Sequence, residues 1–318
     1  MSAIAAVAVV VLAITSLLIG ASDISWAGLL ASGWDDGPLQ VLLISRLPRT
    51  LALVLAGTAM AVAGLLMQML ARNRFVEPST VGTAESANLG FLLVLLIAPE
   101  APIPVRLAVA SGVALFGTLI FLKILDRIPL QSTLLVPIIG IMLGGVVNAV
   151  ATFLAYRFDL MQSLASWSMG DFSMVLMGRY EALWIGLALT VIAYRLADWF
   201  TVAAMGQDLT INLGLNYRLV IFLGLTIVSV ITAVVVGSVG MIPFLGLVVP
   251  NLVSLALGDN MRRTVPWVAV LGAGTVLACD IAGRLIIYPY EIPIGTVLGV
   301  LGSGLFLFLL LRKHVRLA

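Results

Sequence analysis

The chain has 318 residues, of which 62% are hydrophobic and only 10% are charged. Soluble domains carry about 25% charged residues, so this composition excludes a water-soluble protein. The single cysteine (Cys279) and the single histidine (His314) exclude a disulfide framework and a Cys/His metal cluster, and no basic patch interleaved with aromatic residues points to nucleic acid.

Ten apolar segments follow one another along the chain, separated by polar residues, glycine or proline. Most are close to the length of about 20 residues that a helix needs to cross a bilayer. Each is predicted to be a helix, because a segment in lipid must satisfy its own backbone hydrogen bonds. No hydrophilic stretch is long enough for a separate soluble domain, so residues 1–318 are predicted to form one all-α membrane domain. The predicted spans cover residues 3–21, 48–70, 82–98, 105–125, 133–156, 181–199, 217–238, 243–257, 264–284 and 293–311.

The basic residues in the loops predict how these helices are oriented, because lysine and arginine concentrate on the cytoplasmic side of a membrane. If the N-terminus is cytoplasmic, eleven basic residues lie inside, namely Arg72, Arg74, Lys123, Arg127, Arg195, Arg218, Arg262, Arg263, Arg312, Lys313 and Arg316. Six then lie outside, namely Arg46, Arg49, Arg106, Arg157, Arg179 and Arg284. The flipped arrangement reverses this ratio. The sequence therefore predicts a multi-pass protein of the inner membrane with both termini in the cytoplasm.

Two loops are longer than simple connections. The outer loop, at about residues 159–180, is too polar to cross a membrane and contains Trp167. The inner loop, at about residues 203–216, carries a short segment between Gly206 and Gly214. Within that segment Leu209 and Leu213 are four residues apart, which predicts a short amphipathic helix with glycine at each end.

The sequence shows no nucleotide-binding or catalytic motif. Neither Lys123 nor Lys313 follows a glycine, so no Gly-x-x-x-x-Gly-Lys-Ser/Thr phosphate loop is present. The glycine-rich run at residues 299–304 lies inside a predicted span, which favours helix packing over dinucleotide binding. The sequence therefore indicates that the chain is not an enzyme and binds no cofactor itself.

Ionisable residues inside predicted spans are costly, so each is a functional candidate. Asp280 and Arg284 are four residues apart and share one helix face. They form either an internal ion pair or an arrangement in which Asp280 and Glu291 hold Arg284 at the outer surface. Glu85, three residues after Gly82, either caps the first turn of its helix or lines a substrate path.

The fifth predicted span carries a stripe of small, mildly polar residues that recur every four positions, at Gly140, Gly144, Asn148 and Thr152. This stripe is either a tight helix crossing or one wall of a translocation path. Three of the polar residues in spans, Gln68, Asn88 and Asn148, are also interpreted as hydrogen-bonding residues between helices. The candidate path residues are Gln68, Glu85, Asn88, Gly140, Gly144, Asn148, Thr152 and Trp167.

Arg46, Arg49 and Arg284 lie at the predicted outer face, where the positive-inside rule does not account for them. One interpretation is that they reach lipid phosphates. The other is that they dock the carboxylates of a partner, which a guanidinium binds with a fixed geometry. Pro48 stiffens the segment between Arg46 and Arg49, which favours the docking interpretation.

A set of short motifs occurs in a specific order and spacing, although each alone is weak. In chain order they are Arg46-Leu-Pro-Arg49, Ala63-Gly-Leu-Leu-Met-Gln68, Arg72-Asn73, Pro78-Ser-Thr-Val-Gly82, Trp167-Ser-Met-Gly170, the loop Gly206 to Gly214, Gly240-Met-Ile-Pro-Phe-Leu-Gly-Leu-Val-Val-Pro250-Asn251, Asp280-Ile-Ala-Gly-Arg284 and Glu291-Ile-Pro-Ile-Gly295. Together they resemble the permease family of iron-siderophore and cobalamin ABC importers, from Arg46 to Arg312. Asn251, Glu85 and Asp171 stand where many members have other residues, and these variants look like the ferric-siderophore branch with catecholate and petrobactin importers.

The resemblance implies a fold of ten spans, the type II importer permease fold, with a second permease (a copy or a different chain) around a central pathway. A substrate-binding protein would deliver the ferric siderophore outside, in contact with Arg46, Arg49 and Arg284. Two ABC ATPase subunits, which carry the ATP and Mg, would dock inside on the loop residues Gly206, Gln207, Asp208, Leu209, Leu213 and Gly214.

Two other functions compete with this interpretation. An ion-coupled secondary transporter would carry several acids along its coupling path, whereas only Glu85 and Asp280 are deep candidates here. A membrane-embedded enzyme would need a catalytic set that the sequence lacks. Co-purification with an ATPase would discriminate among the three.

Overall fold

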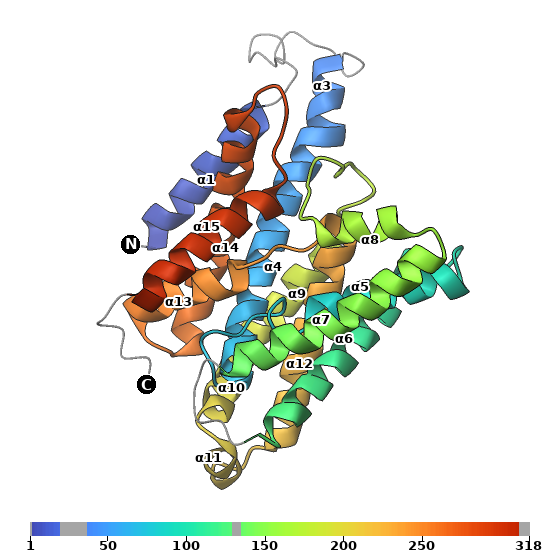
Figure 1. Cartoon of the computed structure of the whole chain (residues 1–318). Helices are drawn as coiled ribbons and strands as arrows, with labels where there is room; N and C mark the ends of the chain where they lie inside the picture. The colour runs from blue at the N-terminus through green and yellow to red at the C-terminus, as the bar shows by residue number, and fades with distance from the viewer. Residues whose placement is uncertain (1, 20–36, 129–134, 312–318) are drawn as a thin grey trace.

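The structure is a computed structural model that describes residues 2–19, 37–128 and 135–311 (Figure 1). Every regular element in these ranges is helical, so the predicted all-α class is confirmed for the described part of the chain. The elements are α1 (Ser2–Leu18), α3 (Gly37–Val41), the π-helix η1 (Leu42–Arg46), α4 (Leu47–Leu70), α5 (Thr83–Ile97), α6 (Ile103–Leu125), α7 (Leu135–Arg157), α8 (Met161–Ser168), α9 (Leu183–Arg195), α10 (Ala197–Ala204), α11 (Gln207–Asn212), α12 (Tyr217–Val239), α13 (Leu245–Leu257), α14 (Met261–Ile286) and α15 (Ile294–Leu311).

The predicted count of ten spans is not confirmed. Within the described residues, five stretches are long and apolar enough to cross a membrane, namely Leu39–Leu70, α6, α7, α12 and α14. The pair α9 and α10 gives a sixth if it is taken as one span. The remaining apolar helices α1, α5, α13 and α15 are shorter. A helix of 13 residues such as α13 is about 20 Å long, which is less than the roughly 30 Å of a bilayer's hydrocarbon core.

Two predicted spans differ from the observed helices. The span predicted at residues 181–199 is broken, because α9 ends at Arg195 and α10 continues at an angle of 65° to it. The span predicted at 48–70 begins too late, because the helical stretch is already under way at Leu39. Pro48 does not start this helix, since η1 directly precedes it and no side-chain cap is made at Arg46.

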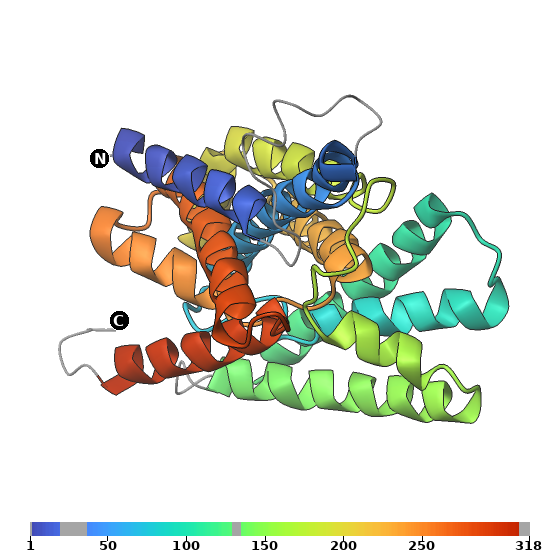
Figure 2. The ribbon, with the colours of Figure 1, turned by 90° about the horizontal axis from the view of Figure 1, so that it is seen from above.

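Helix α4 forms the centre of the bundle (Figure 1). Most of its residues are buried, and it packs against α14, α12, α13 and α9. Seen from above in Figure 2, α5, α6 and α7 gather on one side of α4, whereas α1, α13, α14 and α15 gather on the other. Helix α4 contacts α1, α13 and α14 of the second group directly, whereas α12, which packs against α4, connects it to α5 and α6 of the first.

Glycines on α4 bring two neighbouring helices into backbone contact. A Cβ atom added at Gly57 would lie 2.8 Å from the carbonyl oxygen of Gly272 on α14. A Cβ atom added at Gly64 would lie only 2.1 Å from the carbonyl oxygen of Gly246 on α13. Small residues permit such close approach in membrane helices. These two crossings fix how α13 and α14 sit on α4.

Candidate functional site

A cluster of charged residues joins α4, α14 and the loop before α15. Arg49 donates one hydrogen bond of 2.7 Å to Asp280 Oδ1 and another of 2.7 Å to Glu291 Oε2. Arg284 donates to the other carboxylate oxygen of Asp280. The Asp280 side chain is fully buried, and the Arg284 side chain is 6% exposed. The two arginines and two carboxylates therefore balance one another in charge, and the geometry contains the internal ion pair that was one of the two sequence interpretations.

The same side of the bundle places two guanidiniums against the C-terminal end of α1. Arg46 Nη1 donates to the carbonyl oxygens of Leu17 and Leu18, at 2.9 and 3.0 Å. Arg284 Nη1 donates to the carbonyls of Ser16 and Ile19, at 3.1 and 2.8 Å. The last carbonyls of a helix have no partner within the helix and carry its negative end, so arginines stabilise it.

The three predicted docking arginines thus have partners within the chain, and their role toward a binding protein stays a prediction. Arg46 and Arg284 are both buried. Arg49 is 13% exposed, and its partner Glu291 is 31% exposed. Of this cluster, the pair of Arg49 and Glu291 is the edge that is most accessible from outside.

Gln68 makes the hydrogen bond between helices that the sequence suggested. Pro250 lies inside α13 and has no N–H, so the carbonyl of Gly246, four residues earlier, lacks its usual helical partner. Gln68 Nε2 from α4 donates to that carbonyl at 3.1 Å. The Gln68 side chain is buried in this conformation, so its candidate role in the path stays a prediction.

Glu77 is a buried acid that the sequence reasoning missed. Its Oε1 accepts hydrogen bonds from the backbone N–H of Phe244 at 2.8 Å and from Ser79 Oγ at 2.5 Å. This places a carboxylate at the N-terminus of α13, where negative charge is favoured. Burial raises the pKa of the Glu77 carboxyl, and these hydrogen bonds oppose the shift. The residue lies next to Pro78 in a loop, and its spacing gives no signal because its partner is far away in the chain.

Asn88 and Trp167 meet where α5, α8 and the end of α12 come together. Asn88 Nδ2 donates to the sulfur of Met241 at 3.6 Å. The backbone N–H of Met241 donates to the carbonyl of Trp167 at 3.0 Å. The Trp167 ring lies on Phe91, with 5.4 Å between centroids. Asn88 is buried and Trp167 is partly buried, so the two candidate path residues share one packed cluster.

The predicted stripe on α7 divides into two parts. A Cβ atom added at Gly140 would lie 2.2 Å from the carbonyl of Thr80, and one added at Gly144 would lie 3.3 Å from Gly82 Cα. These two glycines form a tight crossing with the segment before α5. Farther along the helix Asn148 is exposed and Thr152 is partly buried. The first half of the stripe is thus a tight helix crossing, and the role of Asn148 and Thr152 as one wall of a translocation path stays a prediction.

Glu85 lies in the first turn of α5, close to this crossing. Its Oε2 would be 3.4 Å from a Cβ atom at Gly144. Among the described residues that oxygen has no hydrogen-bond partner. Gly82 precedes the helix with a positive φ of 83°. Glu85 is therefore placed at the positive end of the helix, and its carboxylate retains capacity for a ligand or for water.

The predicted short helix of the inner loop is present as α11. Gly206 and Gly214, on its two sides, have φ of 126° and 80°, conformations that favour glycine. Leu209 and Leu213 are exposed, so the apolar face of α11 has no partner in the described chain. Gln207 and Asp208 are exposed as well. The loop thus presents a short rigid element with an uncovered apolar surface.

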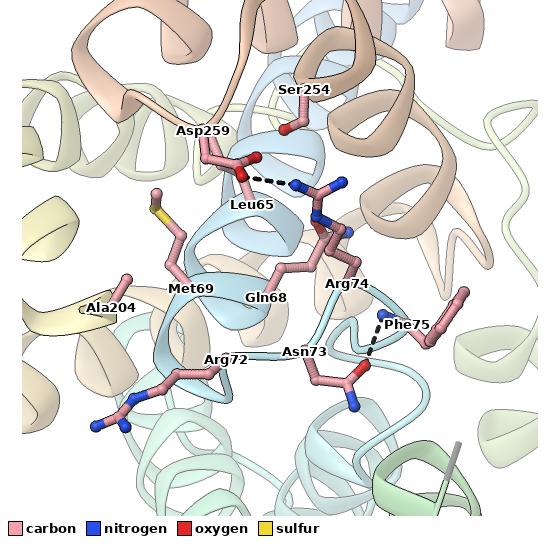
Figure 3. Close-up of a pocket in the computed structure, with 10 residues that line it drawn as sticks. All are labelled: Leu65, Gln68, Met69, Arg72, Asn73, Arg74, Phe75, Ala204, Ser254 and Asp259. Atoms are coloured by element: carbon pink, nitrogen blue, oxygen red, sulfur yellow. Dashed lines mark hydrogen bonds and ion pairs between the residues drawn. The ribbon is translucent and has the colours of Figure 1, made fainter. Parts of the chain in front are cut away.

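A cavity of about 330 Å³ lies beside the end of α4 (Figure 3). Arg74 points toward Asp259, with 2.6 Å between the charged atoms, whereas Arg72 points away from Arg74. The two cations therefore do not converge within the cavity. Within the described residues, no three His, Cys, Asp or Glu side chains lie together as metal ligands.

The comparisons with known proteins agree on one family. The chain matches the FecCD transport family over residues 8–312. It is 48% identical over 304 residues to a petrobactin import system permease protein of Bacillus subtilis, which covers 96% of each chain. It is 44% identical over 311 residues to a petrobactin import system permease protein of Bacillus anthracis, with 98% of this chain and 91% of the relative covered.

A solved structure supports the fold. An inward-facing metal-chelate type ABC transporter superposes with a TM-score of 0.79 at 24% identity, over 96% of this chain and 97% of that one. The family match over residues 8–312 and the long apolar helices both indicate a membrane permease. The chain belongs to the FecCD transport family and is a membrane permease, not an enzyme.

Proposed function

We propose that this chain is the permease subunit of an ABC importer that moves a ferric siderophore of the catecholate or petrobactin type into the cell. The observation that carries the substrate class is the 48% identity to a petrobactin permease over nearly the whole of both chains. The residues Glu85, Asp171 and Asn251, which depart from many family members, support the same branch.

The proposed assembly contains two permease chains, two ATPase subunits that hydrolyse ATP with Mg, and one substrate-binding protein. Residues 1–318 form one membrane domain with ten spans, in which the shorter helices α1, α5, α13 and α15 also cross. Both termini lie in the cytoplasm, as the distribution of basic residues supports. The short helices can cross because neighbouring helices cover their ends and the bilayer adapts to mismatch.

The proposed contact with the ATPase is the inner loop at residues 203–216. Its exposed apolar face suits a groove on another protein, as a short amphipathic helix does in helix-in-groove recognition. The contact residues are Gly206, Gln207, Asp208, Leu209, Leu213 and Gly214. The outer loop at residues 159–180 is proposed to lie on the opposite side of the membrane.

Gly214→Val is expected to reduce uptake per ATP at least tenfold while the protein still inserts. A β-branched residue at the φ of 80° costs about 1–3 kcal/mol of backbone strain, which α11 can relieve only by changing its orientation. No atom lies within 4 Å of the added Cβ, so the effect is not a clash. The measurement is uptake of ferric petrobactin and phosphate release by the full complex in proteoliposomes.

The matched control is Gly178→Val in the outer loop, where φ is 92° and the surroundings are also open. It carries the same strain outside the proposed ATPase contact, so its uptake per ATP should equal that of the wild type. A Gly214→Val complex with normal coupling would contradict the coupling role. ATP hydrolysis by the isolated chain, or uptake without an ATPase, would contradict the function itself.

Asn148 is proposed to line the path together with Glu85 and Thr152. Asn148→Cys should react with a water-soluble thiol reagent, and the rate should change when ATP binds to the complex. The native Cys279 is buried and should contribute little background. Gly112→Cys, at an exposed position of α6, provides the lipid-facing control. If the two cysteines react equally slowly in every nucleotide state, Asn148 does not line the path.

The edge formed by Arg49 and Glu291 is proposed as the center of binding-protein docking, with Arg46 and Arg284 behind it. Charges at the rim of an interface act mainly on association and are screened by salt. Affinity for the loaded binding protein should therefore fall as ionic strength rises, and Arg49→Gln should flatten that dependence. The control is Arg106→Gln, at an arginine bonded to the carbonyls of Pro99 and Ala101, which should leave the salt dependence of the affinity unchanged. An unchanged salt dependence for Arg49→Gln would leave the lipid interpretation standing.

A further inference from the structure

The residues between α4 and α5, at positions 71–82, contact several otherwise separate parts of the bundle. We call them the hub segment. At its start Arg72 has a φ of 46°, a left-handed conformation that is uncommon for a residue other than glycine. Such a conformation persists where the surrounding structure holds it in place. The contacts of the hub segment show what holds it.

Arg72 bonds one end of the loop that contains α11 and lies beside the other end. Its Nη2 donates to the hydroxyl of Tyr217 at 3.0 Å, and its guanidinium lies 5.8 Å from the centroid of that ring. Its Nη1 would be 3.7 Å from a Cβ atom at Gly206. Tyr217 is the first residue of α12 and Gly206 directly precedes α11. A displacement of α11 therefore acts on Arg72.

Farther along, the hub segment holds both ends of α13. Glu77 accepts the backbone N–H of Phe244, directly before α13 begins. Asn251 Nδ2 donates to the carbonyl of Arg74 at 2.8 Å, and Arg74 pairs with Asp259 beyond the end of α13. Three contacts thus join one short segment to the start, the middle and the end of this helix.

Near its start, the hub segment has one exposed side chain, Arg72, which borders open space, whereas Asn73 and Glu77 are buried. Arg72 and Asn73 line the cavity of about 330 Å³ seen in Figure 3. They also line a second, open groove of about 1070 Å³ that extends to α11. Glu77, in contrast, is 1% exposed. The exposed Arg72 side chain is therefore the part of the hub segment that faces α11, and the buried Glu77 carboxylate is the part that faces the start of α13.

We propose that the hub segment is the mechanical connection through which a displacement of α11 reaches α13, with Arg72 as the positioning residue at the input and Glu77 at the output. The source of the displacement, a docked ATPase, rests on the proposed function. The connection itself is a property of this chain. In this proposal Arg72, Tyr217 and Glu77 transmit a displacement and do not bind substrate.

Hydrogen exchange at the amide of Phe244 measures whether a change at Arg72 reaches the start of α13, because Glu77 is the group that protects this amide. In nanodiscs that contain the permease alone, Arg72→Ala should accelerate exchange at Phe244 about fivefold, since a cation–π contact and a hydrogen bond are lost at the input. Tyr217→Phe keeps the ring and should have a smaller effect in the same direction. Arg263→Ala, at an exposed arginine of α14, is the matched control and should leave Phe244 unchanged.

The same measurement with the ATPase added separates this proposal from the proposed function. In the wild type, the ATPase should slow exchange in α11 and alter it at Phe244. In Arg72→Ala the change in α11 should remain, and the change at Phe244 should disappear. Acceleration confined to residues 206–217 in Arg72→Ala would overturn the connection. An ATPase that leaves α11 exchange unchanged would instead overturn the proposed function, and the experiment with the permease alone would still decide the connection.

Discussion

Asp280→Asn is expected to destabilise the folded protein by about 3–5 kcal/mol, as does the removal of one partner from a buried ion pair. Asp280 accepts Arg49 on one carboxylate oxygen and Arg284 on the other. Asparagine has nearly the same shape but no charge, so two guanidiniums would be left with Glu291 as the one remaining carboxylate of the cluster. The attachment of α1 should weaken too, because Arg284 also bonds the carbonyls of Ser16 and Ile19.

Thermal unfolding of the purified permease in nanodiscs measures this effect. The matched control is Asp198→Asn, which breaks the pair of Asp198 and Arg262. Both partners of that pair are mostly exposed, and exposed pairs contribute about 0–1 kcal/mol. Asp280→Asn should therefore lower the unfolding temperature by far more than Asp198→Asn. Equal shifts would show that the buried cluster is not important for stability.

Gly64→Val is expected to cost about 3 kcal/mol or more, at the upper end of overpacking substitutions. The new Cβ would lie 2.1 Å from the carbonyl oxygen of Gly246 and 2.2 Å from its Cα, and backbone atoms cannot rotate away as a side chain can. Relief requires α4 and α13 to separate. Separation would also break the hydrogen bond from Gln68 to Gly246.

Gly112→Val on α6 is the comparison, because no atom lies within 4 Å of a Cβ atom at that position. The yield of folded permease and its unfolding temperature should fall strongly for Gly64→Val and remain near the wild type for Gly112→Val. A Gly64→Val protein that unfolds like the wild type would mean that α4 and α13 do not cross as closely as described.

The helical class and the approximate positions of most helices could be predicted because lipid leaves a spanning segment little choice of backbone structure. The break between α9 and α10 could not, because no glycine or proline marks Leu196, and its charged neighbours Arg195 and Asp198 equally suit the end of one unbroken span. The number of spans could not be predicted from the hydropathy pattern either. Whether a short helix such as α13 crosses depends on its neighbours, and a hydropathy pattern does not contain them.

The candidate site was predictable where partners are close in sequence. Four-residue spacing revealed the pair of Asp280 and Arg284, and glycine spacing revealed α11. Arg49 was singled out for its position, but its bond to Asp280 joins two helices that are distant in the chain. Glu77 was missed for the same reason. Gly140 and Gly144 share a face with Asn148, yet only tertiary packing decides which part of that face is covered.

The hydrogen bond from Gln68 to Gly246 has a consequence for how this sequence can change over time. Pro250 removes the helical donor that this carbonyl would otherwise have, and the side chain on α4 replaces it. A substitution of Gln68 that removes its donor should be harmful while Pro250 is present and much milder once position 250 regains an N–H. The effects of substitutions at the two positions are therefore coupled. Replacing Pro250 first gives a stable intermediate sequence, whereas replacing Gln68 first leaves the Gly246 carbonyl without a donor.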